Sequence, residues 1–317
     1  MIAFLKLIRV QNLLIIAFTQ YMVRWCLIYP ILQSQSHYYT LVLTNFQFFL
    51  LVLSTVMIAA GGYIINDYFD IKIDKVNKPE HIVIGKGVKR RVAMGAHTVI
   101  SILGVAIGLY VSFSIGFWKL VFIHFIWATG LWFYSTTFKR KFLIGNLFIA
   151  FFIALVPLVV GIYELILCYK VYFPIDETIN LNVIWKWVLG VTFFAFITTL
   201  LREILKDIED YEGDKEYGCN TMPIVIGVPA SKVVVVMITL ATMVCLAYLQ
   251  YLQTSIKDLI GFYYFAFALQ LPFALLIFMT VAAKTKKAFH NAGNLAKLIM
   301  LSGVCYLIVF AYYLLHP

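Results

Sequence analysis

Charged side chains are scarce in this chain of 317 residues. Lys, Arg, Asp and Glu together make up 13% of it, whereas 63% of the residues are hydrophobic. Soluble domains carry about 25% charged residues, so the composition excludes a water-soluble fold, and the mean hydropathy of +0.92 agrees. The sequence therefore indicates a polytopic membrane protein.

Cysteines are also few, and they show no paired spacing. The five lie far apart, at Cys26, Cys168, Cys219, Cys245 and Cys305. A disulfide framework or a zinc site needs closely spaced Cys or His residues. We expect neither.

Long apolar runs are abundant, and a run of about 20 residues is enough to cross a bilayer. Nine can be marked out, at 12–32, 42–65, 92–113, 117–134, 142–165, 184–205, 230–250, 259–282 and 295–315. The first lacks a small-residue cleavage site, so we expect a retained helix rather than a removed signal peptide. The prediction is a single all-α domain over 1–317, with nine transmembrane helices around a central cavity.

The distribution of basic residues predicts the orientation. Twenty of the 25 Lys and Arg residues fall on one side of the predicted membrane, and such loops are usually cytoplasmic. We expect an integral protein of the cell (plasma) membrane with a cytoplasmic N-terminus and an external C-terminus. The net charge of +10 does not indicate nucleic-acid binding, because topology and anionic lipid headgroups account for it.

Acidic residues are the scarcest charged type, and they cluster. Of fifteen in the chain, eleven lie in 66–80 and 203–216. Each region contains the pattern D-x-x-D-x-x-x-D, formed by Asp67, Asp70 and Asp74 and again by Asp207, Asp210 and Asp214. On a helix these spacings put three carboxylates on one face. Because like charges repel, each cluster predicts a cation, and carboxylate oxygens suit Mg²⁺.

Each cluster follows an apolar run that is expected to cross the membrane from outside to inside, the second run and the sixth. The clusters begin 140 positions apart. This suggests two pseudo-repeated halves whose clusters face each other at the cytoplasmic mouth of the cavity. One chemistry uses all the carboxylates: they hold Mg²⁺, Mg²⁺ holds a diphosphate, and Lys or Arg neutralises the remaining charge as the C–O bond breaks. Aromatic residues, 17% of the chain, can stabilise the allylic cation that is left.

These motifs resemble the UbiA superfamily of intramembrane prenyltransferases. The likeness covers almost the whole chain and includes Asn66 before the first Asp, the segment 77–79 after the first motif and the segment 221–223 after the second. It implies that the Asp motifs bind Mg²⁺ and diphosphate, that a prenyl chain lies in a groove among the helices, and that an acceptor is prenylated near the cytoplasmic face.

The resemblance also implies roles for individual residues. Catalytic roles fall to Asp67, Asp70, Asp207, Asp210, Lys139 and Tyr134. Metal binding falls to Asp67, Asp70, Asp74, Asp207, Asp210 and Asp214. Substrate binding falls to Asn66, Arg9, Asn12, Lys78, Lys206 and Asn146, although Asn146 could equally serve helix packing.

Some features depart from the family's pattern or stay open. The family's Tyr-x-x-x-Lys appears here as Tyr134 to Lys139, one residue longer. The Gly-Lys-Gly sequence around Lys86 fits a flexible loop better than a phosphate cradle. We expect Arg24, inside the first apolar run, to extend to the outer interface rather than to bind substrate. His97 and His124 are expected to be hydrogen-bonded rather than ligands.

The resemblance leaves the acceptor open. The entry to the first helix at 9–13 and the stretch 139–146 are most similar to the branch that transfers a geranylgeranyl group to geranylgeranylglycerol phosphate, in ether lipid synthesis. An aromatic quinone precursor is the alternative acceptor. An ion-coupled transporter is a distant alternative, since transporter sites usually lie near the bilayer midplane. The expected partners are thus a polyprenyl diphosphate, a lipophilic acceptor and membrane lipid, and the oligomeric state stays open.

Overall fold

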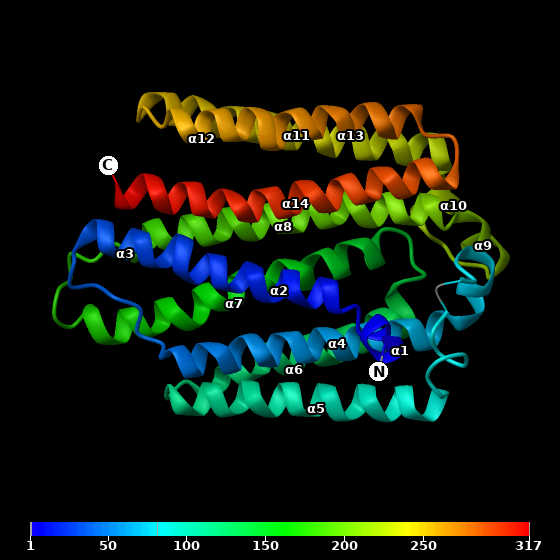
Figure 1. Cartoon of the computed structure of the whole chain (residues 1–317), viewed down its shortest axis with the longest axis horizontal. Helices are drawn as coiled ribbons and strands as arrows, with labels where there is room; N and C mark the ends of the chain where they lie inside the picture. Colours follow the sequence, from blue (N-terminus) through cyan, green and yellow to red (C-terminus); the bar gives the residue numbers. More distant parts are fainter. Residues whose placement is uncertain (1, 81, 317) are drawn as a thin grey trace.

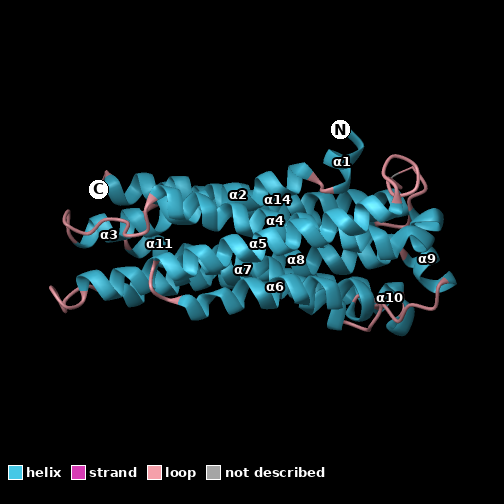
Figure 2. Ribbon diagram, turned by 90° about the horizontal axis from the view of Figure 1, so that it is seen from below, coloured by secondary structure: helices cyan, strands magenta, loops and turns pink. Residues whose placement is uncertain are grey.

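Helices make up most of the structure, a computed structural model that describes residues 2–80 and 82–316. They run back and forth along the long axis of the molecule (Figure 1). The connecting loops gather at its two ends (Figure 2). Within the described residues the β-pairing is limited to an isolated bridge between Ile84 and Val88. The predicted all-α class is confirmed.

Eight helical segments of the described chain are long and apolar enough to cross a membrane. The first, Val10–Gln35, joins α2 (Val10–Met22), η1 (Val23–Ile28) and α3 (Tyr29–Gln35). Then follow α4 (Asn45–Asn77), α5 (Arg90–Ser114), α7 (Ile144–Tyr172), α8 (Leu181–Glu209) and α11 (Val228–Ser255). The last two are Leu259–Ala282, made of α12 (Leu259–Tyr264), η4 (Phe265–Gln270) and α13 (Leu271–Ala282), and α14 (Lys286–Leu315).

The fourth predicted span, 117–134, has a different construction. It corresponds to three consecutive short helices, η2 (Trp118–Leu120), α6 (Val121–Phe133) and η3 (Tyr134–Phe138). Each of these is too short to cross a bilayer alone, so the count of nine spans stays a prediction. The other short helices are α1 (Ile2–Leu7), α9 (Tyr211–Glu216) and α10 (Met222–Ile226).

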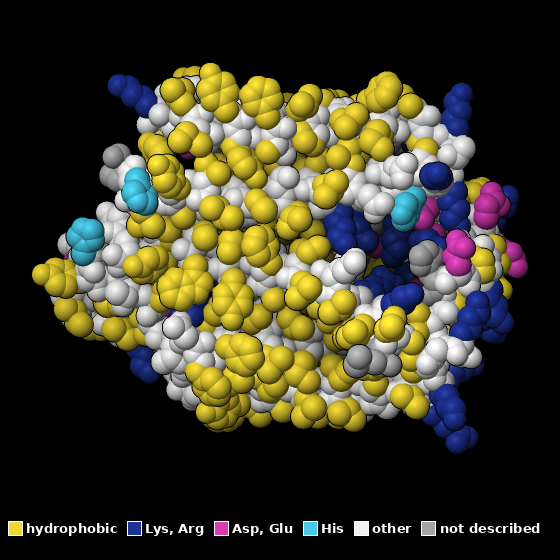
Figure 3. Space-filling model, viewed as in Figure 1, with side chains coloured by type: hydrophobic (Ala, Val, Ile, Leu, Met, Phe, Trp, Pro, Cys, Tyr) yellow, Lys and Arg dark blue, Asp and Glu magenta, His cyan; other side chains and the backbone are white. Residues whose placement is uncertain are grey.

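The lengths of α4 and α8 decide where the acidic motifs lie. With 33 and 29 residues, these helices are about 50 and 44 Å long, whereas the hydrocarbon core is about 30 Å thick. Thr44 starts α4 with a capping box, in which its side chain accepts from Gln47 N. The last turns of α4 and α8 extend to the same end of the bundle (Figure 1), the end at which Asp and Glu side chains gather in Figure 3.

Buried histidines make hydrogen bonds inside the bundle, as expected. His124 Nδ1 lies 2.9 Å from Ser54 Oγ, and its Nε2 lies 3.0 Å from the Tyr163 hydroxyl. His97 Nδ1 lies 2.9 Å from the Gly61 carbonyl oxygen. These contacts join helices α4, α5, α6 and α7 through polar groups that would otherwise be unsatisfied in lipid.

The expectation for Arg24 is wrong. Its side chain is 1% exposed, and its Nε lies 3.4 Å from Glu164 Oε2. It also donates to Asn45 Oδ1 at 3.2 Å and to the Leu43 carbonyl. Glu164 Oε1 in turn accepts from Val42 N at 2.6 Å and Leu43 N at 3.0 Å. A charge inside a bilayer is costly unless it is paired, and here a carboxylate that the sequence analysis did not single out supplies the partner.

Glu164→Gln should therefore destabilise the protein. The change leaves the Arg24 guanidinium buried without a counter-charge, which costs about 3–5 kcal/mol. Unfolding in detergent measures it, with Glu177→Gln, an exposed carboxylate in an end loop, as the control. The double variant Arg24→Met/Glu164→Gln should recover part of the loss. An unfolding midpoint for Glu164→Gln equal to the control would show that the pair is unimportant.

Candidate active site

A cavity of about 550 Å³ lies among the helices, bounded mainly by α2, α4, α7, α8 and α14. Its polar end is lined by Arg9, Asn12, Asn66, Tyr134, Arg202, Glu203, Lys206 and Lys297. Apolar and aromatic side chains line the rest, among them Trp127, Phe152, Phe194, Leu246, Phe265 and Tyr306. Figure 3 shows a hollow surrounded by Lys and Arg close to the end where Asp and Glu gather. The predicted central cavity is confirmed.

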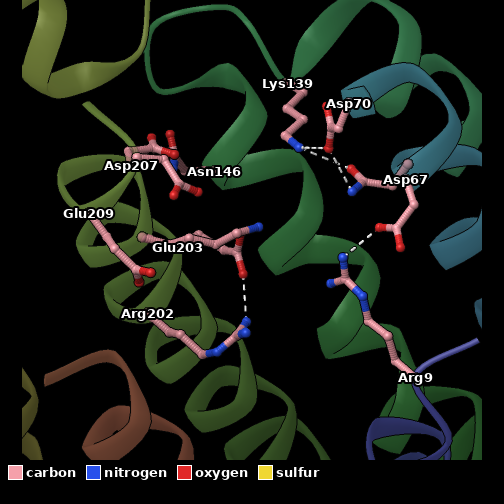
Figure 4. A network of polar contacts seen from close by, with 12 residues as sticks. Arg9, Asp67, Asp70, Lys139, Asn146, Arg202, Glu203, Asp207 and Glu209 are labelled. Carbon is pink, nitrogen blue, oxygen red and sulfur yellow. Dashed lines mark hydrogen bonds and ion pairs between the residues drawn. The ribbon is translucent and has the colours of Figure 1, made fainter. Parts of the chain in front are cut away.

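The first acidic motif lies on the last turns of α4, and cations contact it (Figure 4). Arg9 Nη2 is 2.6 Å from Asp67 Oδ1. Lys139 pairs with Asp70 and donates to Asn66 Oδ1 at 3.2 Å. Asn66 Nδ2 donates to Asp70 Oδ2 at 2.8 Å. These predicted site residues therefore form one network that joins α4 to η3 and to the start of α2.

The backbone of Arg9 is held in an uncommon conformation. It stands between α1 and α2 with φ 52° and ψ 55°, the left-handed region. A side chain other than glycine adopts this region at a cost of about 1–3 kcal/mol, and such costs concentrate at functional sites. Burial opposes the charge of Arg9, but the neighbouring Asp67 carboxylate outweighs that effect and raises the Arg9 pKa. The guanidinium is thus held against Asp67 as a permanent cation.

The second acidic motif begins at the end of α8. Asp207 Oδ2 accepts from Asn146 Nδ2 at 2.8 Å. Lys78 Nζ lies 2.9 Å from Asp210 Oδ1 and 3.3 Å from Glu209 Oε1. Burial disfavours the Lys78 ammonium, but these two carboxylates outweigh it and raise the Lys78 pKa. Lys78 follows α4 directly, so it connects the ends of α4 and α8.

The sequence predicted Asp207, Asp210 and Asp214 on one helical face, and this is wrong. Helix α8 ends at Glu209, and Asp210 has φ −92° and ψ 9°, so Asp214 lies on the separate helix α9. Asn77 causes the change of direction, because its amide donates to the Asp210 carbonyl and accepts from Gly213 N, both at 3.0 Å. A Cβ on Gly213 would lie 2.5 Å from Asn77 Nδ2. Only glycine allows this contact, which joins the two motifs.

The third carboxylate of each motif lies C-terminal to the other two, and in the second motif it lies on α9 rather than on α8. Asp214 accepts from Thr221 Oγ1 at 3.2 Å. Burial, together with the nearby negative charge of Asp210, raises the Asp214 pKa to about 6. Asp74 lies half-buried on α4, one turn beyond Asp70. Both are outer members of their motifs.

The donor set suits Mg²⁺ bound together with a phosphate ligand. Among the described residues, no three His, Cys, Asp or Glu side chains are arranged as a complete metal cage. Mg²⁺ rarely uses such a cage, and usually takes one or two carboxylates, water and substrate phosphates. The carboxylates of Asp67 and Asp70, and of Asp207 and Asp210, provide hard oxygen donors from α4 and from the end of α8. The residues present fit this mode.

The extra residue between Tyr134 and Lys139 has a structural explanation. Residues 134–138 form the π-helical turn η3, and Lys139 N donates to Tyr134 O at 2.9 Å, five positions back. A π-turn accommodates one more residue than an α-turn. Tyr134 therefore lines the cavity while Lys139 reaches Asp70. Burial opposes the Lys139 charge, but Asp70 outweighs it and raises the Lys139 pKa.

Asn12 and Lys206 remain of the predicted substrate residues, and Lys86 of the features that the sequence left open. Asn12 and Lys206 line the polar end of the cavity, and Lys206 Nζ lies 3.5 Å from Glu203 Oε2. Lys86 instead donates to the Pro79 carbonyl at 3.0 Å within its own exposed loop. The loop interpretation of the Gly-Lys-Gly sequence is supported over the phosphate cradle.

Three residues of the polar end were not identified from the sequence. Arg202 Nη1 lies 2.6 Å from Glu203 Oε1, and Lys297 Nζ lies 2.6 Å from Asn12 Oδ1. Glu203 could have been predicted from the sequence, because it lies one helical turn before Asp207 and therefore on the same face of α8. The sequence around Lys297 gave no such indication, apart from a single charge near the start of a long apolar run.

Comparison with known proteins places the chain in a family. A model of the UbiA prenyltransferase family matches residues 27–298, which include both acidic motifs. A digeranylgeranylglyceryl phosphate synthase of Sulfolobus acidocaldarius is 32% identical over 240 residues, 75% of this chain and 78% of that protein. One of Methanosphaera stadtmanae is 29% identical over 249 residues, 78% and 81% of the two chains.

Solved structures share the fold. A structure concerned with digeranylgeranylglyceryl phosphate synthase in membranes has a TM-score of 0.65 and 23% identity over 98% of both chains. A UbiA homologue from Archaeoglobus fulgidus, solved with GPP and Mg²⁺, has a TM-score of 0.54 and 15% identity over 97% of this chain and 99% of that one. The same arrangement of helices is thus found at low sequence identity.

Proposed function

Because the chain belongs to the UbiA prenyltransferase family, we propose that it transfers a geranylgeranyl-type group from its diphosphate to geranylgeranylglyceryl phosphate. The chain is an integral membrane prenyltransferase, and the proposal concerns its donor, its acceptor and the roles of its residues. One observation carries the proposal: Asn77 joins the two acidic motifs, and Asn66 and Lys206, which directly precede the first aspartate of each motif, line the polar end of a mostly apolar cavity.

The donor diphosphate would be held between the two motifs. Asp67 and Asp70 on α4 and Asp207 and Asp210 at the end of α8 are the carboxylates that would hold Mg²⁺. When bound, Mg²⁺ would stabilise the negative charge that develops on the leaving diphosphate as the allylic C–O bond breaks. Fixed charges in a water-poor site stabilise such a step more than they would in water.

The cations that now pair with the motif carboxylates have a second role in this proposal. Lys139 and Arg9 each contact one motif aspartate. Once the carboxylates hold metal, these cations can donate to diphosphate oxygens without moving far. The phenol of Tyr134 lines the same end of the cavity. Trp127 and Phe152 line the adjacent wall, where aromatic faces exclude water and favour developing positive charge.

The apolar part of the cavity suits a long isoprenoid tail. On α8 the lining runs from Lys206 to Lys186, about 30 Å along the helix axis. This length is comparable with the hydrocarbon core of a bilayer. A tail of several isoprene units can therefore lie along the membrane normal while its diphosphate remains at the charged end.

Two different observations support the proposed acceptor and the proposed orientation of the chain in the membrane. The relatives from Sulfolobus acidocaldarius and Methanosphaera stadtmanae are digeranylgeranylglyceryl phosphate synthases, which favours a glyceryl phosphate lipid as acceptor and a role in ether lipid synthesis. The excess of basic residues at the end that carries both motifs (Figure 3) favours a cytoplasmic active site and N-terminus and an external C-terminus, in the cell membrane.

The acceptor is tested by product analysis. Purified protein in vesicles receives geranylgeranyl diphosphate and Mg²⁺ with either geranylgeranylglyceryl phosphate or a panel of hydroxybenzoate and dihydroxynaphthoate acids. We expect the mass of a digeranylgeranylglyceryl phosphate and pyrophosphate in equal amount. A prenylated aromatic product without ether lipid would show that the acceptor is aromatic, and the proposal for the donor site would be unaffected.

Replacing the inner aspartates by alanine should abolish most transfer. Asp67, Asp70, Asp207 and Asp210 would each hold the dication that stabilises the leaving diphosphate, so each change should lower the rate by about 10²-fold or more. Asp74 lies one helical turn beyond Asp70, and Asp214 lies on α9 beyond the end of α8, so alanine at either position should lower the rate less. Glu212→Ala removes an exposed carboxylate from α9 and serves as the matched control. Near-normal rates in Asp67→Ala or Asp207→Ala, with the control also normal, would refute the assignment.

A further inference from the structure

A second group of cations occupies the polar end of the cavity, apart from Lys139 and Lys78. Arg202 extends from α8, Lys297 from α14, and Arg9 from the start of α2, and all three line the cavity. In Figure 4, Arg202 and Arg9 lie opposite each other, on the side away from Asp207 and from the pair of Asp70 with Lys139.

Positive side chains outnumber negative ones around this group of cations. Of the described residues that line the cavity, Glu203 is the one acidic side chain, against Arg202, Lys206, Lys297 and, at the far end, Lys186. Arg9 also lines the cavity, but it pairs with Asp67 at 2.6 Å. Arg202 and Lys206 share Glu203, at 2.6 and 3.5 Å. The hydrogen-bond partner of Lys297 in the described structure is neutral, the Asn12 amide oxygen at 2.6 Å. Positive charges gathered in a partly buried site repel one another, so an anion placed among them would be stabilised.

The position of this group relative to the Asp motifs separates it from the donor diphosphate. Arg202 precedes Asp207 on α8 by five residues, which is about 8 Å along the helix axis toward the middle of the membrane. An anion beside Arg202 and Lys297 would therefore lie deeper than the diphosphate, next to the apolar part of the cavity. An acceptor that carries both a phosphate and a reacting hydroxyl on a short glyceryl backbone could span this separation.

We propose that Lys297 and Arg202, with Asn12 beside them and Arg9 at the border of the donor site, form the binding site for the phosphate group of the acceptor lipid. This proposal rests on the proposed function. The phosphate monoester accepts hydrogen bonds from the Lys297 ammonium and the Arg202 guanidinium. Its glyceryl hydroxyl then points toward the Asp motifs and its isoprenoid chain toward the apolar cavity. Glu203 holds Arg202 and Lys206 in place and keeps the empty site from being excessively positive.

The site explains a choice between acceptors. A neutral glyceryl lipid would bring no counter-charge to Lys297, whose described partner is the neutral Asn12 amide, and would lack the contacts that orient the hydroxyl. Bulk phospholipid headgroups are phosphodiesters with one negative charge, whereas the acceptor monoester carries a charge of up to −2 near neutral pH. The site should therefore prefer the monoester.

The test measures acceptor and donor constants separately, in vesicles of zwitterionic lipid with the full chain. Lys297→Met should raise the KM for geranylgeranylglyceryl phosphate about tenfold or more, the loss of one charge-assisted hydrogen bond. The KM for geranylgeranyl diphosphate should change less than about twofold on this reasoning. Arg202→Gln should act in the same direction, and Lys297→Arg should restore most of the affinity. Lys287→Met removes an exposed cation from the same helix and should leave both constants unchanged.

Each outcome decides a different point. If the wild-type protein forms no ether product, the proposed function fails and this site fails with it. If the wild type is active but Lys297→Met and Arg202→Gln raise the donor KM rather than the acceptor KM, these cations belong to the diphosphate site and the proposal is overturned. With phosphate-free geranylgeranylglycerol, wild type and Lys297→Met should be equally poor. The assay is repeated in vesicles to which anionic lipid is added. An effect of Lys297→Met that follows this anionic lipid content, and not the acceptor concentration, would assign the site to membrane headgroups instead.

Discussion

Repulsion among carboxylates at one end of a membrane bundle is the constraint on which the site depends. Asp67, Asp70 and Asp210 each have a cation beside them, Arg9, Lys139 and Lys78, and Asp207 has the amide of Asn146. Arg9 lies between α1 and α2, Lys139 directly follows η3, Lys78 directly follows α4, and Asn146 lies on α7. Neutralising the acidic ends therefore also ties the helices together around the cavity mouth.

The same pairing prepares the site for a highly charged ligand. In the proposed reaction, a diphosphate with Mg²⁺ would bring both signs of charge. The motif carboxylates would then hold the metal, and the ammonium and guanidinium groups now paired with them would bind phosphate oxygens. Little reorganisation is then needed at bond breaking, which is the source of electrostatic stabilisation in preorganised sites. The second cation group, around Lys297 and Arg202, extends this principle to the acceptor.

The sequence predicted those features that depend on local pattern. Apolar runs located eight spans, and the spacing of Asp67, Asp70 and Asp74 placed them on one face of α4. Features that depend on distant contacts were out of reach of a single sequence. Asn77 bends the chain after α8 through hydrogen bonds across 133 and 136 positions, and Glu164 pairs with Arg24 across 140. The approach of Lys297 to Asn12 spans 285 positions, so no local signal could reveal it.

The central claim is that the two acidic motifs hold one metal-bound diphosphate between them. The most direct measurement is a crystal structure with Mn²⁺ and a thio-diphosphate analogue of geranylgeranyl diphosphate, in which anomalous scattering locates the metal. The account predicts Mn²⁺ peaks touching Asp67 or Asp70 on one side and Asp207 or Asp210 on the other, with the diphosphate bridging them. Metal bound at the bilayer midplane, or a diphosphate bound away from both motifs, would contradict it.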